Sequence, residues 1–318
     1  MLAECYPLRR QLGELVAVIE LVDVSKTFKG LRRRRVALSK LNLEVREGGV
    51  HGFLGPNGSG KTTTIRILLG LIRPSGGSIK VLGRSVPRDL AQTSRDIGSL
   101  IEAPAFYGSI SAMKNLQLTA DLLGLGKARV EEALEIVGLS DRATDKLSTF
   151  SLGMKQRLAI ASTLLAKPRL LVLDEPANGL DPQGIVEVRE LIKGLGTHGG
   201  TTVFVSSHQL AEVAQMCDRI SILKAGQCLL TTDIGSNSAG LVARRYRIRV
   251  SDASRARDLL ANAGMTVSLH DEYLEVAGDM DPSQITRILA SSGEYLSELT
   301  QVGSDLEAMY LRVAGEPA

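Results

Sequence analysis

One short apolar run predicts a strand that is buried on both faces, and two other places along the chain also predict strands. The run at 170–173 consists of four consecutive apolar residues, and 202–205 is a second strand-like run. Residues 51–54 are predicted to be the end of a third strand, and a glycine-rich turn follows them. Uninterrupted runs of this length are typical of parallel sheets whose two faces are both covered by helices. The sequence therefore predicts a parallel α/β core.

The first half of the chain contains two other patterns. Residues 18–50 alternate apolar and polar positions, as half-buried antiparallel strands do. Residues 93–149 lack strand signals and show helical spacing at 113–123 and 130–137. We therefore expect an antiparallel β subdomain near the N-terminus and a helical subdomain over about residues 93–165.

The last quarter of the chain is predicted to form a separate small domain. The segment 231–243 is rich in Thr, Ser, Asp, Gly and Asn, which suits a linker. Beyond it the pattern indicates an α+β fold without glycine-rich loops or clustered acids. The expected elements are a strand at 246–250, a helix at 254–263, a hairpin at 266–276, a helix at 282–291, a strand at 295–302 and a last helix at 305–313.

The turn after the run at 51–54 carries the first chemical motif. Residues 55–62 read GPNGSGKT and fit the phosphate-binding pattern G-x-x-x-x-G-K-[ST], and an amphipathic helix follows. Glycines allow the backbone to approach an anion closely, and the N-terminus of the helix adds its dipole. Lys61 is placed to reach the β- and γ-phosphates and Thr62 to offer a hydroxyl to Mg²⁺. The alternative is a glycine-rich turn that binds nothing. The residues expected to bind nucleotide are Gly55, Pro56, Asn57, Gly58, Ser59, Gly60, Lys61, Thr62 and Thr63.

Polar groups follow the other two apolar runs. We expect Asp174 to hold Mg²⁺, directly or through water, and Glu175 to orient and deprotonate the attacking water. A solvated acidic loop is the alternative. His208 follows the run at 202–205, at the edge where parallel sheets bind ligands. A lone histidine is more often structural, but this position favours a functional role. Lys61, Glu175 and His208 are the expected catalytic residues.

In order and spacing, these motifs resemble the ATP-binding subunit of an ABC transporter, over residues 18 to about 230. The resemblance also assigns the signature sequence FSLGM at 150–154, whose Ser151 and Gly153 would face a γ-phosphate. Phe28 lies where the family has an aromatic residue that stacks on adenine. The remaining segments correspond to Walker A (55–62), Walker B (170–175), the D-loop (179–181) and the switch histidine (His208).

This resemblance implies a fold and a set of partners. The fold would be an α/β P-loop cassette at 18–232, with a RecA-like parallel core, an antiparallel β subdomain and a helical subdomain. Residues 1–17 would form an N-terminal extension, and 244–318 a small C-terminal accessory domain. The cassette would bind ATP and Mg²⁺ and pair with a second copy of itself. It would also dock on a separately encoded permease at the cytoplasmic face of the cell membrane, and no nucleic acid is expected.

Three positions depart from the family's usual motifs. Leu152 replaces a glycine of the usual signature LSGGQ, so the closest approach of that backbone to phosphate is in question. Glu102 replaces the usual glutamine of the Q-loop, and would either contact Mg²⁺ or face the membrane partner. Ala177 and Asn178 precede the D-loop in place of the common Thr-Ser or Thr-Ala. The SLGM signature with an acidic Q-loop resembles the subset that exports bacitracin-like peptides and lantibiotics.

A run of four arginines at 32–35 interrupts the expected antiparallel strands. Four adjacent cations could contact phosphate or lipid headgroups. Such a run is more often a solvated hairpin turn, and we favour that interpretation here.

Composition limits the choice of function. The chain's 318 residues suit one cassette plus a small domain. A net charge of +3 does not argue for nucleic acid, and three cysteines without metal-binding spacing suit a reducing cytosol. No run of about eighteen apolar residues is present, so we expect no membrane span. The expected function is ATP hydrolysis for an exporter of antibiotics or antimicrobial peptides. The alternatives are a soluble ABC ATPase acting on ribosomes or nucleic acid, and an ABC-2 exporter of another cargo such as polysaccharide.

Overall fold

The computed structural model describes residues 17–29, 34–102, 105–198, 200–234, 244–270, 273–278 and 281–301. The chain divides into two compact units, Met1–Thr231 and Thr232–Ala318. Nearly all of the predicted N-terminal extension, most of the predicted linker and the predicted helix at 305–313 lie outside the described residues.

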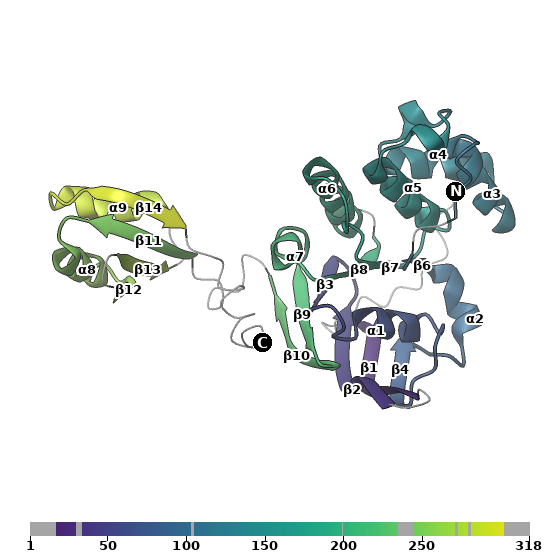
Figure 1. Cartoon of the computed structure of the whole chain (residues 1–318), viewed down its shortest axis with the longest axis horizontal. Coiled ribbons are helices and arrows are strands. Elements are labelled where there is room, and N and C mark those ends of the chain that lie inside the picture. The colour runs from purple at the N-terminus through teal and green to yellow at the C-terminus, as the bar shows by residue number, and fades with distance from the viewer. Residues whose placement is uncertain are drawn as a thin grey trace, which may run out of the picture. The chain divides into compact units, whose positions relative to one another are not determined.

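The first unit is built on a six-stranded sheet with the strand order β10-β9-β3-β8-β7-β6 (Figure 1). β3 pairs in parallel with β8 and β9, and β7 pairs in parallel with β8 and β6. Residues 170–173 of β7 are buried, which confirms the prediction that this strand is covered on both faces, and all residues of β3 and β8 are buried as well. The strands are β3 (Val50–Leu54), β6 (Ile97–Leu100), β7 (Leu170–Asp174), β8 (Thr202–Ser207), β9 (Arg219–Lys224) and β10 (Gln227–Asp233).

Strand β6 corrects the prediction that residues 93–149 contain no strand. It is only four residues long and includes Gly98, so its sequence has no alternation that could mark it. It forms because it pairs along its length with β7, at the edge of the sheet. A Cβ on Gly98 would lie 2.6 Å from the carbonyl oxygen of Thr163, so the glycine permits helix α5 (Leu152–Leu164) to pack closely on this strand. The helical subdomain therefore begins after β6, later than predicted.

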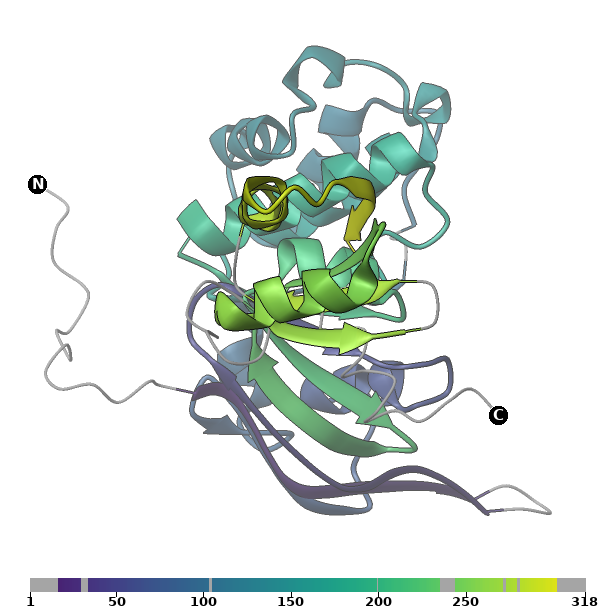
Figure 2. The same cartoon turned by 90° about the vertical axis from the view of Figure 1, so that its left-hand side faces the viewer.

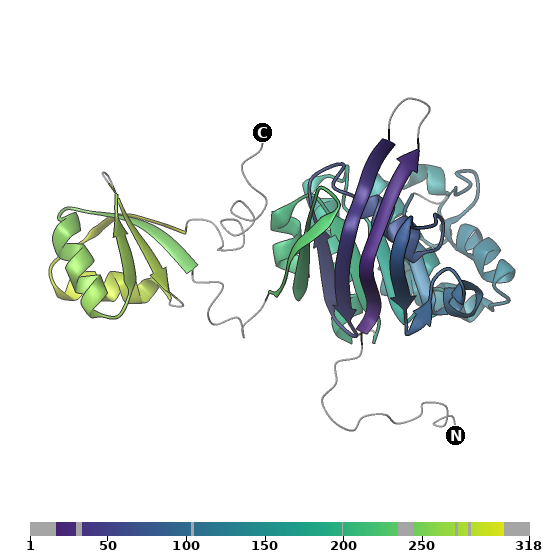
Figure 3. The ribbon, with the colours of Figure 1, turned by 90° about the horizontal axis from the view of Figure 1, so that it is seen from below.

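A second, four-stranded sheet has the order β2-β1-β4-β5. Its strands are β1 (Ala17–Lys29), β2 (Arg34–Arg46), β4 (Gly76–Val81) and β5 (Arg84–Ser85), and each neighbouring pair is antiparallel. Figures 2 and 3 show β1 and β2 as two long strands, side by side. This arrangement confirms the antiparallel β subdomain that the alternating pattern predicted.

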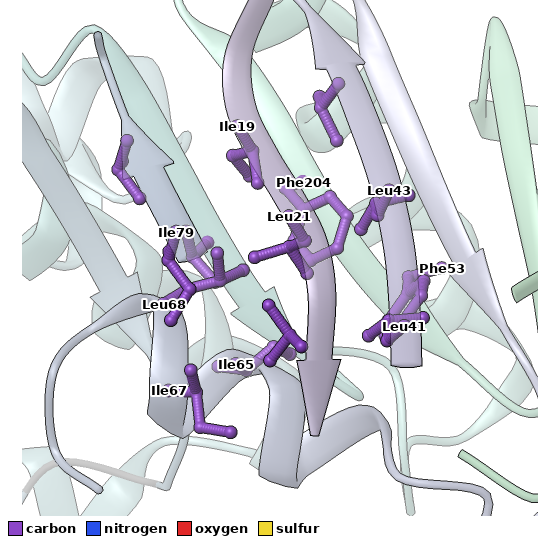
Figure 4. Close-up of a cluster of buried hydrophobic side chains, with 14 of the residues drawn as sticks. Ile19, Leu21, Leu41, Leu43, Phe53, Ile65, Ile67, Leu68, Ile79 and Phe204 are labelled. Atoms are coloured by element: carbon purple, nitrogen blue, oxygen red, sulfur yellow. The ribbon is translucent and has the colours of Figure 1, made fainter. Parts of the chain in front are cut away.

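One hydrophobic core joins the two sheets through helix α1 (Lys61–Leu68), as Figure 4 shows. The helix packs against β7 of the parallel sheet and against β2 and β4 of the antiparallel sheet. Because α1 begins at the predicted phosphate-binding loop, this core fixes the position of that loop. Core residues include Ile19, Leu21, Leu41, Leu43, Phe53, Ile65, Leu68 and Phe204.

The remaining helices of the first unit either pack on the parallel sheet or form a separate helical subdomain. Helices α3 (Ala112–Leu122), α4 (Lys127–Ile136) and α5 pack on one another and form the helical subdomain. α6 (Pro182–His198) contacts α5, β3 and β8, and α7 (Leu210–Met216) contacts β3 and β8. The short helix α2 (Leu90–Thr93) precedes β6. Among the described residues, no helix combines the length and the apolar character needed to cross a bilayer.

The second unit has the element order β-α-β-β-α-β and a four-stranded antiparallel sheet in the order β12-β13-β11-β14. The predicted strands, hairpin and helices between 246 and 302 are confirmed. Residues from the sheet and both helices form a core of their own, which includes Tyr246, Ile248, Leu260, Val276, Ile285 and Leu289. The elements are β11 (Arg244–Val250), α8 (Ala253–Asn262), β12 (Thr266–Leu269), β13 (Leu274–Gly278), α9 (Pro282–Ser291) and β14 (Leu296–Gln301).

Candidate nucleotide site

The loop between β3 and α1 is held in a tight space that only glycines fit. Gly60 has φ of +115°, and a Cβ there would lie 2.8 Å from the carbonyl oxygen of Ala37 on β2. A Cβ on Gly55 would lie 2.3 Å from the carbonyl oxygen of Leu223 on β9. Any other residue at these positions would push the loop away from both sheets. The glycines of the motif therefore set the shape of the loop, as well as giving an anion access to it.

Lys61 is the first residue of α1, and its side chain is only 5% exposed. Its Nζ donates hydrogen bonds to the carbonyl oxygens of Gly55 (2.6 Å) and Pro56 (3.3 Å). The same ammonium lies 3.2 Å from Oε1 of Glu175, which follows β7. The buried cation is thus directed into the loop and is paired with the predicted catalytic base.

Glu175 has an unusual backbone that directs its side chain. Its φ is +50°, a left-handed conformation that is uncommon for any residue except glycine and is often found at active sites. Its N–H donates to the carbonyl oxygen of Ser206 (3.2 Å) and to Oγ of the same serine (3.0 Å). Oε2 of Glu175 lies 2.6 Å from Nδ1 of His208. One carboxylate therefore contacts both Lys61 and His208, the other two predicted catalytic residues.

Asp174, the last residue of β7, accepts a hydrogen bond from the Ser206 hydroxyl. Thr62 lies next to Lys61 at the start of α1, where it faces the cavity described below. Both are oxygen donors, the kind of ligand that Mg²⁺ prefers. Within the described residues there is no group of three or more His, Cys, Asp or Glu side chains that could hold a metal by itself. This donor set fits Mg²⁺, which is usually held by one or two protein oxygens together with substrate phosphates and water.

A cavity of about 340 Å³ collects most of the predicted site residues. Its walls come from the phosphate-binding loop, the start of α1, the β1–β2 ribbon and the ends of β7 and β8. Phe28 on β1 is 41% exposed and lies under the Lys26 ammonium, which is 4.9 Å from the centre of its ring. The lining residues are Phe28, Arg35, Ala37, Asn57, Gly58, Gly60, Lys61, Thr62, Thr63, Glu175, Asn178 and His208.

Three of these lining residues were absent from the predicted site. Arg35 belongs to the arginine run that we interpreted as a solvated turn, and Ala37 follows it on β2. Asn178 precedes the D-loop, and its N–H donates to the carbonyl oxygen of Glu175 (3.1 Å). The arginine run was the one sequence signal that pointed toward this part of the site.

Glu102 lies elsewhere. Its carboxylate, 80% exposed, forms an ion pair of 3.1 Å with Arg66 of α1, and it does not line the cavity. Its predicted role as a metal ligand is not tested by this geometry and stays a prediction. Gly55, Pro56, Ser59 and Asp174 also lie outside the lining; the first three belong to the loop itself, and Asp174 is tied to Ser206.

The signature segment also lies outside the cavity of its own chain. Ser151 caps helix α5, and its Oγ accepts a hydrogen bond from the N–H of Met154 (3.2 Å). Gly153 packs against Gly184 of α6, since a Cβ on Gly153 would lie 3.5 Å from the Cα of Gly184. Leu152, the residue that replaces a glycine, is 56% exposed. The signature segment thus forms the N-terminus of α5, with Ser151 and Leu152 exposed and Gly153 buried.

The phosphate-binding loop, the buried lysine and the carboxylate after β7 define a P-loop nucleoside triphosphatase. Comparisons with known proteins agree with this class. The sequence family described as "ABC transporter" matches residues 38–178, and a domain of unknown function (DUF8746) matches 244–307. The bacitracin transport ATP-binding protein BcrA of Bacillus licheniformis is 36% identical, over 94% of this chain and 97% of its own length.

Two further comparisons cover the cassette. The lantibiotic transport ATP-binding protein SrtF of Streptococcus pyogenes is 41% identical, over 62% of this chain and 84% of its own length. A dimeric, post-hydrolysis structure of the ATP-binding cassette MJ0796 with ADP and Pi has a TM-score of 0.61 at 27% identity, over 69% of this chain and 99% of that one. The chain therefore belongs to the family of ABC transporter ATP-binding proteins, and it is an ATP-binding cassette ATPase.

Proposed function

We propose that this ATPase powers the export of an antibiotic or antimicrobial peptide through a separately encoded permease at the cytoplasmic face of the cell membrane. The observation that carries the ATPase part is the contact of Glu175 with both Lys61 and His208. The cargo class is supported by the similarity to BcrA and SrtF, whose names refer to bacitracin and lantibiotic transport. A signature with Leu152 and an acidic residue at 102 are consistent with that subset.

The chemistry assigned to the site begins with a change of partner at Lys61. Nζ of Lys61 lies 3.2 Å from Oε1 of Glu175. A polyphosphate in the loop carries more negative charge than one carboxylate, so it attracts the ammonium more strongly. Glu175 is then released from Lys61 and can accept a proton from water, while His208 holds its other oxygen in place.

Thr62 and Asp174 are the residues that would hold Mg²⁺, which supplies charge neutralisation at the phosphates. Asp174 is oriented for this role by the Ser206 hydroxyl, whose oxygen also accepts the N–H of Glu175. The metal ligand and the base are therefore positioned by one serine. Shifting that serine would displace both groups together.

A second copy of the chain would complete each site. Ser151 and Gly153 lie at the N-terminus of α5, where unpaired backbone N–H groups and the helix dipole favour an anion. Since neither residue lines the cavity of its own chain, we assign them to the γ-phosphate bound by the partner copy. Closing and opening of this dimer would be the movement that drives the permease.

Copurification tests the proposal directly. The tagged chain should be extracted from detergent-solubilised membranes together with a multi-span protein, and deletion of its gene should raise sensitivity to bacitracin or a lantibiotic. A Glu175→Gln variant should copurify normally and fail to restore resistance, which separates docking from catalysis. Recovery with ribosomes in place of membranes would contradict the transport function. Copurification with a permease but unchanged antibiotic sensitivity, together with a defect in surface polysaccharide, would favour export of another cargo.

A further inference from the structure

Arg35 stands on the wall of the nucleotide cavity although no motif includes it. In the antiparallel pairing of β1 and β2, Arg35 is the direct partner of Phe28, while Arg34 is the partner of Lys29. Directly paired residues lie on the same face of a β ribbon, and successive residues alternate between faces. Phe28 and Arg35 therefore share the face that lines the cavity, and Arg34 lies on the opposite one.

The position of β2 relative to the phosphate-binding loop is well defined. The backbone of Ala37, two residues after Arg35, closely approaches Gly60, and the N–H of Ser39 donates to the carbonyl oxygen of Gly226 (3.0 Å). These contacts bring the arginine end of the ribbon to the loop. Nη2 of Arg35 lies 3.7 Å from the position that a Cβ on Gly58 would occupy. The guanidinium is thus at the loop where phosphates bind.

The two cations that line the cavity, Lys61 and Arg35, differ in whether an acidic side chain pairs with them. Lys61 is paired with Glu175, so the charges of these two residues cancel each other. Within the described part of the chain, no acidic side chain lies within ion-pair distance of Arg35. Arg35 therefore gives the cavity its net positive charge. A planar guanidinium with several N–H donors is well suited to phosphate oxygens.

We infer that Arg35 is a nucleotide-binding residue that contacts the polyphosphate of ATP, opposite Lys61. The inference rests on nucleotide occupying this cavity, as the proposed function requires. Lys26, which like Phe28 belongs to β1, is the cation that lies over the Phe28 ring. Of the arginine run at 32–35, Arg35 is thus the residue that we assign to the site.

Displacement of a fluorescent ATP analogue from the purified full-length chain tests this inference. The competitors are ADP, inorganic tripolyphosphate and adenosine, and the proteins are wild type, Arg35→Ala, Arg35→Lys and Arg34→Ala. Arg35→Ala should weaken binding of ADP and tripolyphosphate by roughly ten- to a hundredfold, because a charge-assisted hydrogen bond is lost. Adenosine binding should stay the same. Arg35→Lys should recover part of the loss, since lysine keeps the charge without the fork of donors.

Arg34→Ala is the matched control, because it removes an exposed arginine from the neighbouring position, and it should bind like wild type. Thermal unfolding should show that both alanine variants are folded. If Arg35→Ala binds ADP and tripolyphosphate as Arg34→Ala does, the inference is wrong. If Arg35→Ala weakened the binding of adenosine alone, that result would also overturn the inference. Failure of the wild-type chain to bind any nucleotide would instead remove the proposed function, and this inference with it.

Discussion

Glu175 and His208 are joined by a contact of 2.6 Å between Oε2 and Nδ1, although 33 positions separate them in the sequence. Glu175 follows β7 and His208 follows β8, which are adjacent parallel strands, so both residues emerge at the same edge of the sheet. The histidine fixes one carboxylate oxygen and leaves the other near Lys61. The carboxylate is thus held at both oxygens, as we expect for a general base, and mutations of Glu175, His208 and Lys61 test separate parts of this arrangement.

Replacing Glu175 by glutamine should nearly stop ATP turnover and leave nucleotide binding intact. General-base catalysis contributes roughly 10²- to 10⁴-fold, so turnover should fall by at least about a hundredfold. Removing the negative charge also removes repulsion from the γ-phosphate, so the ATP-bound dimer should persist. Gel filtration with MgATP should show a dimer for Glu175→Gln. A monomer with wild-type turnover would refute the assignment of the base.

Replacing His208 by alanine should lower turnover by roughly tenfold or more, with little change in nucleotide affinity. His208 contacts the Glu175 carboxylate, and without it that carboxylate keeps only its contact with Lys61. His270 in the second unit stacks on Tyr273 and is a matched control. His270→Ala should keep wild-type kcat. Equal kcat for both histidine variants would show that His208 has a structural role only.

Substitutions of Lys61 and Ser151 should block ATP hydrolysis at different steps. Lys61→Ala should abolish ATP binding, because the ammonium that would contact the phosphates in the loop is lost. Ser151→Arg should bind ATP as a monomer and fail to dimerise, because we assign Ser151 to the site of the neighbouring copy. A mixture of the two variants can form at most one complete composite site. Ultracentrifugation and ATPase assays on each variant and on the mixture check this, and normal hydrolysis by Ser151→Arg would exclude a role across the interface.

Glu102→Gln should separate the two roles considered for this residue. Its carboxylate pairs with Arg66 and is largely exposed, a position that favours contact with the permease. Exposed ion pairs contribute only about 0–1 kcal/mol, so the melting temperature should change little. We expect the Mg²⁺ concentration for half-maximal ATPase activity to stay the same and stimulation by the permease to fall. A raised Mg²⁺ requirement would instead establish Glu102 as a metal ligand; Arg66→Ala is the control for loss of the ion pair.

Glu212 should make stability depend on pH. Burial raises the pKa of its carboxyl, against the opposing effects of the Ser207 hydrogen bond and nearby His208. A carboxyl whose pKa is higher in the folded than in the unfolded state binds its proton more tightly when folded. Its contribution to stability is therefore present at low pH and is lost as pH rises above the unfolded pKa and through the folded one.

Thermal unfolding of wild type and Glu212→Gln between pH 4 and pH 7 measures this effect. The variant should lose less stability than wild type as pH rises, because glutamine does not titrate. Glu190→Gln, which changes a more exposed glutamate on α6, should follow the wild-type curve. Parallel curves for wild type and Glu212→Gln would contradict the raised pKa.

The sequence by itself determined the class of fold and the main chemistry. Gly55, Gly60, Lys61 and Thr62 belong to one short segment, so their spacing predicts a phosphate site before any tertiary contact is known. The apolar runs predicted buried strands for the same reason, because local composition reflects burial on both faces. The carboxylates at 174 and 175 could be assigned because they follow such a run.

Tertiary structure decided the features that depend on distant segments. β6 exists because β7 offers it a pairing partner, and its four residues have no pattern of their own. The contacts of Glu175 with Lys61 and His208 require three separate strand ends to meet at one edge. Arg35 joins the site only because the β1–β2 register places it beside Phe28, and shifting that register by one residue would turn Arg34 inward instead. Pairing register and strand order are set by the whole fold, and they selected which charged residues became part of the site.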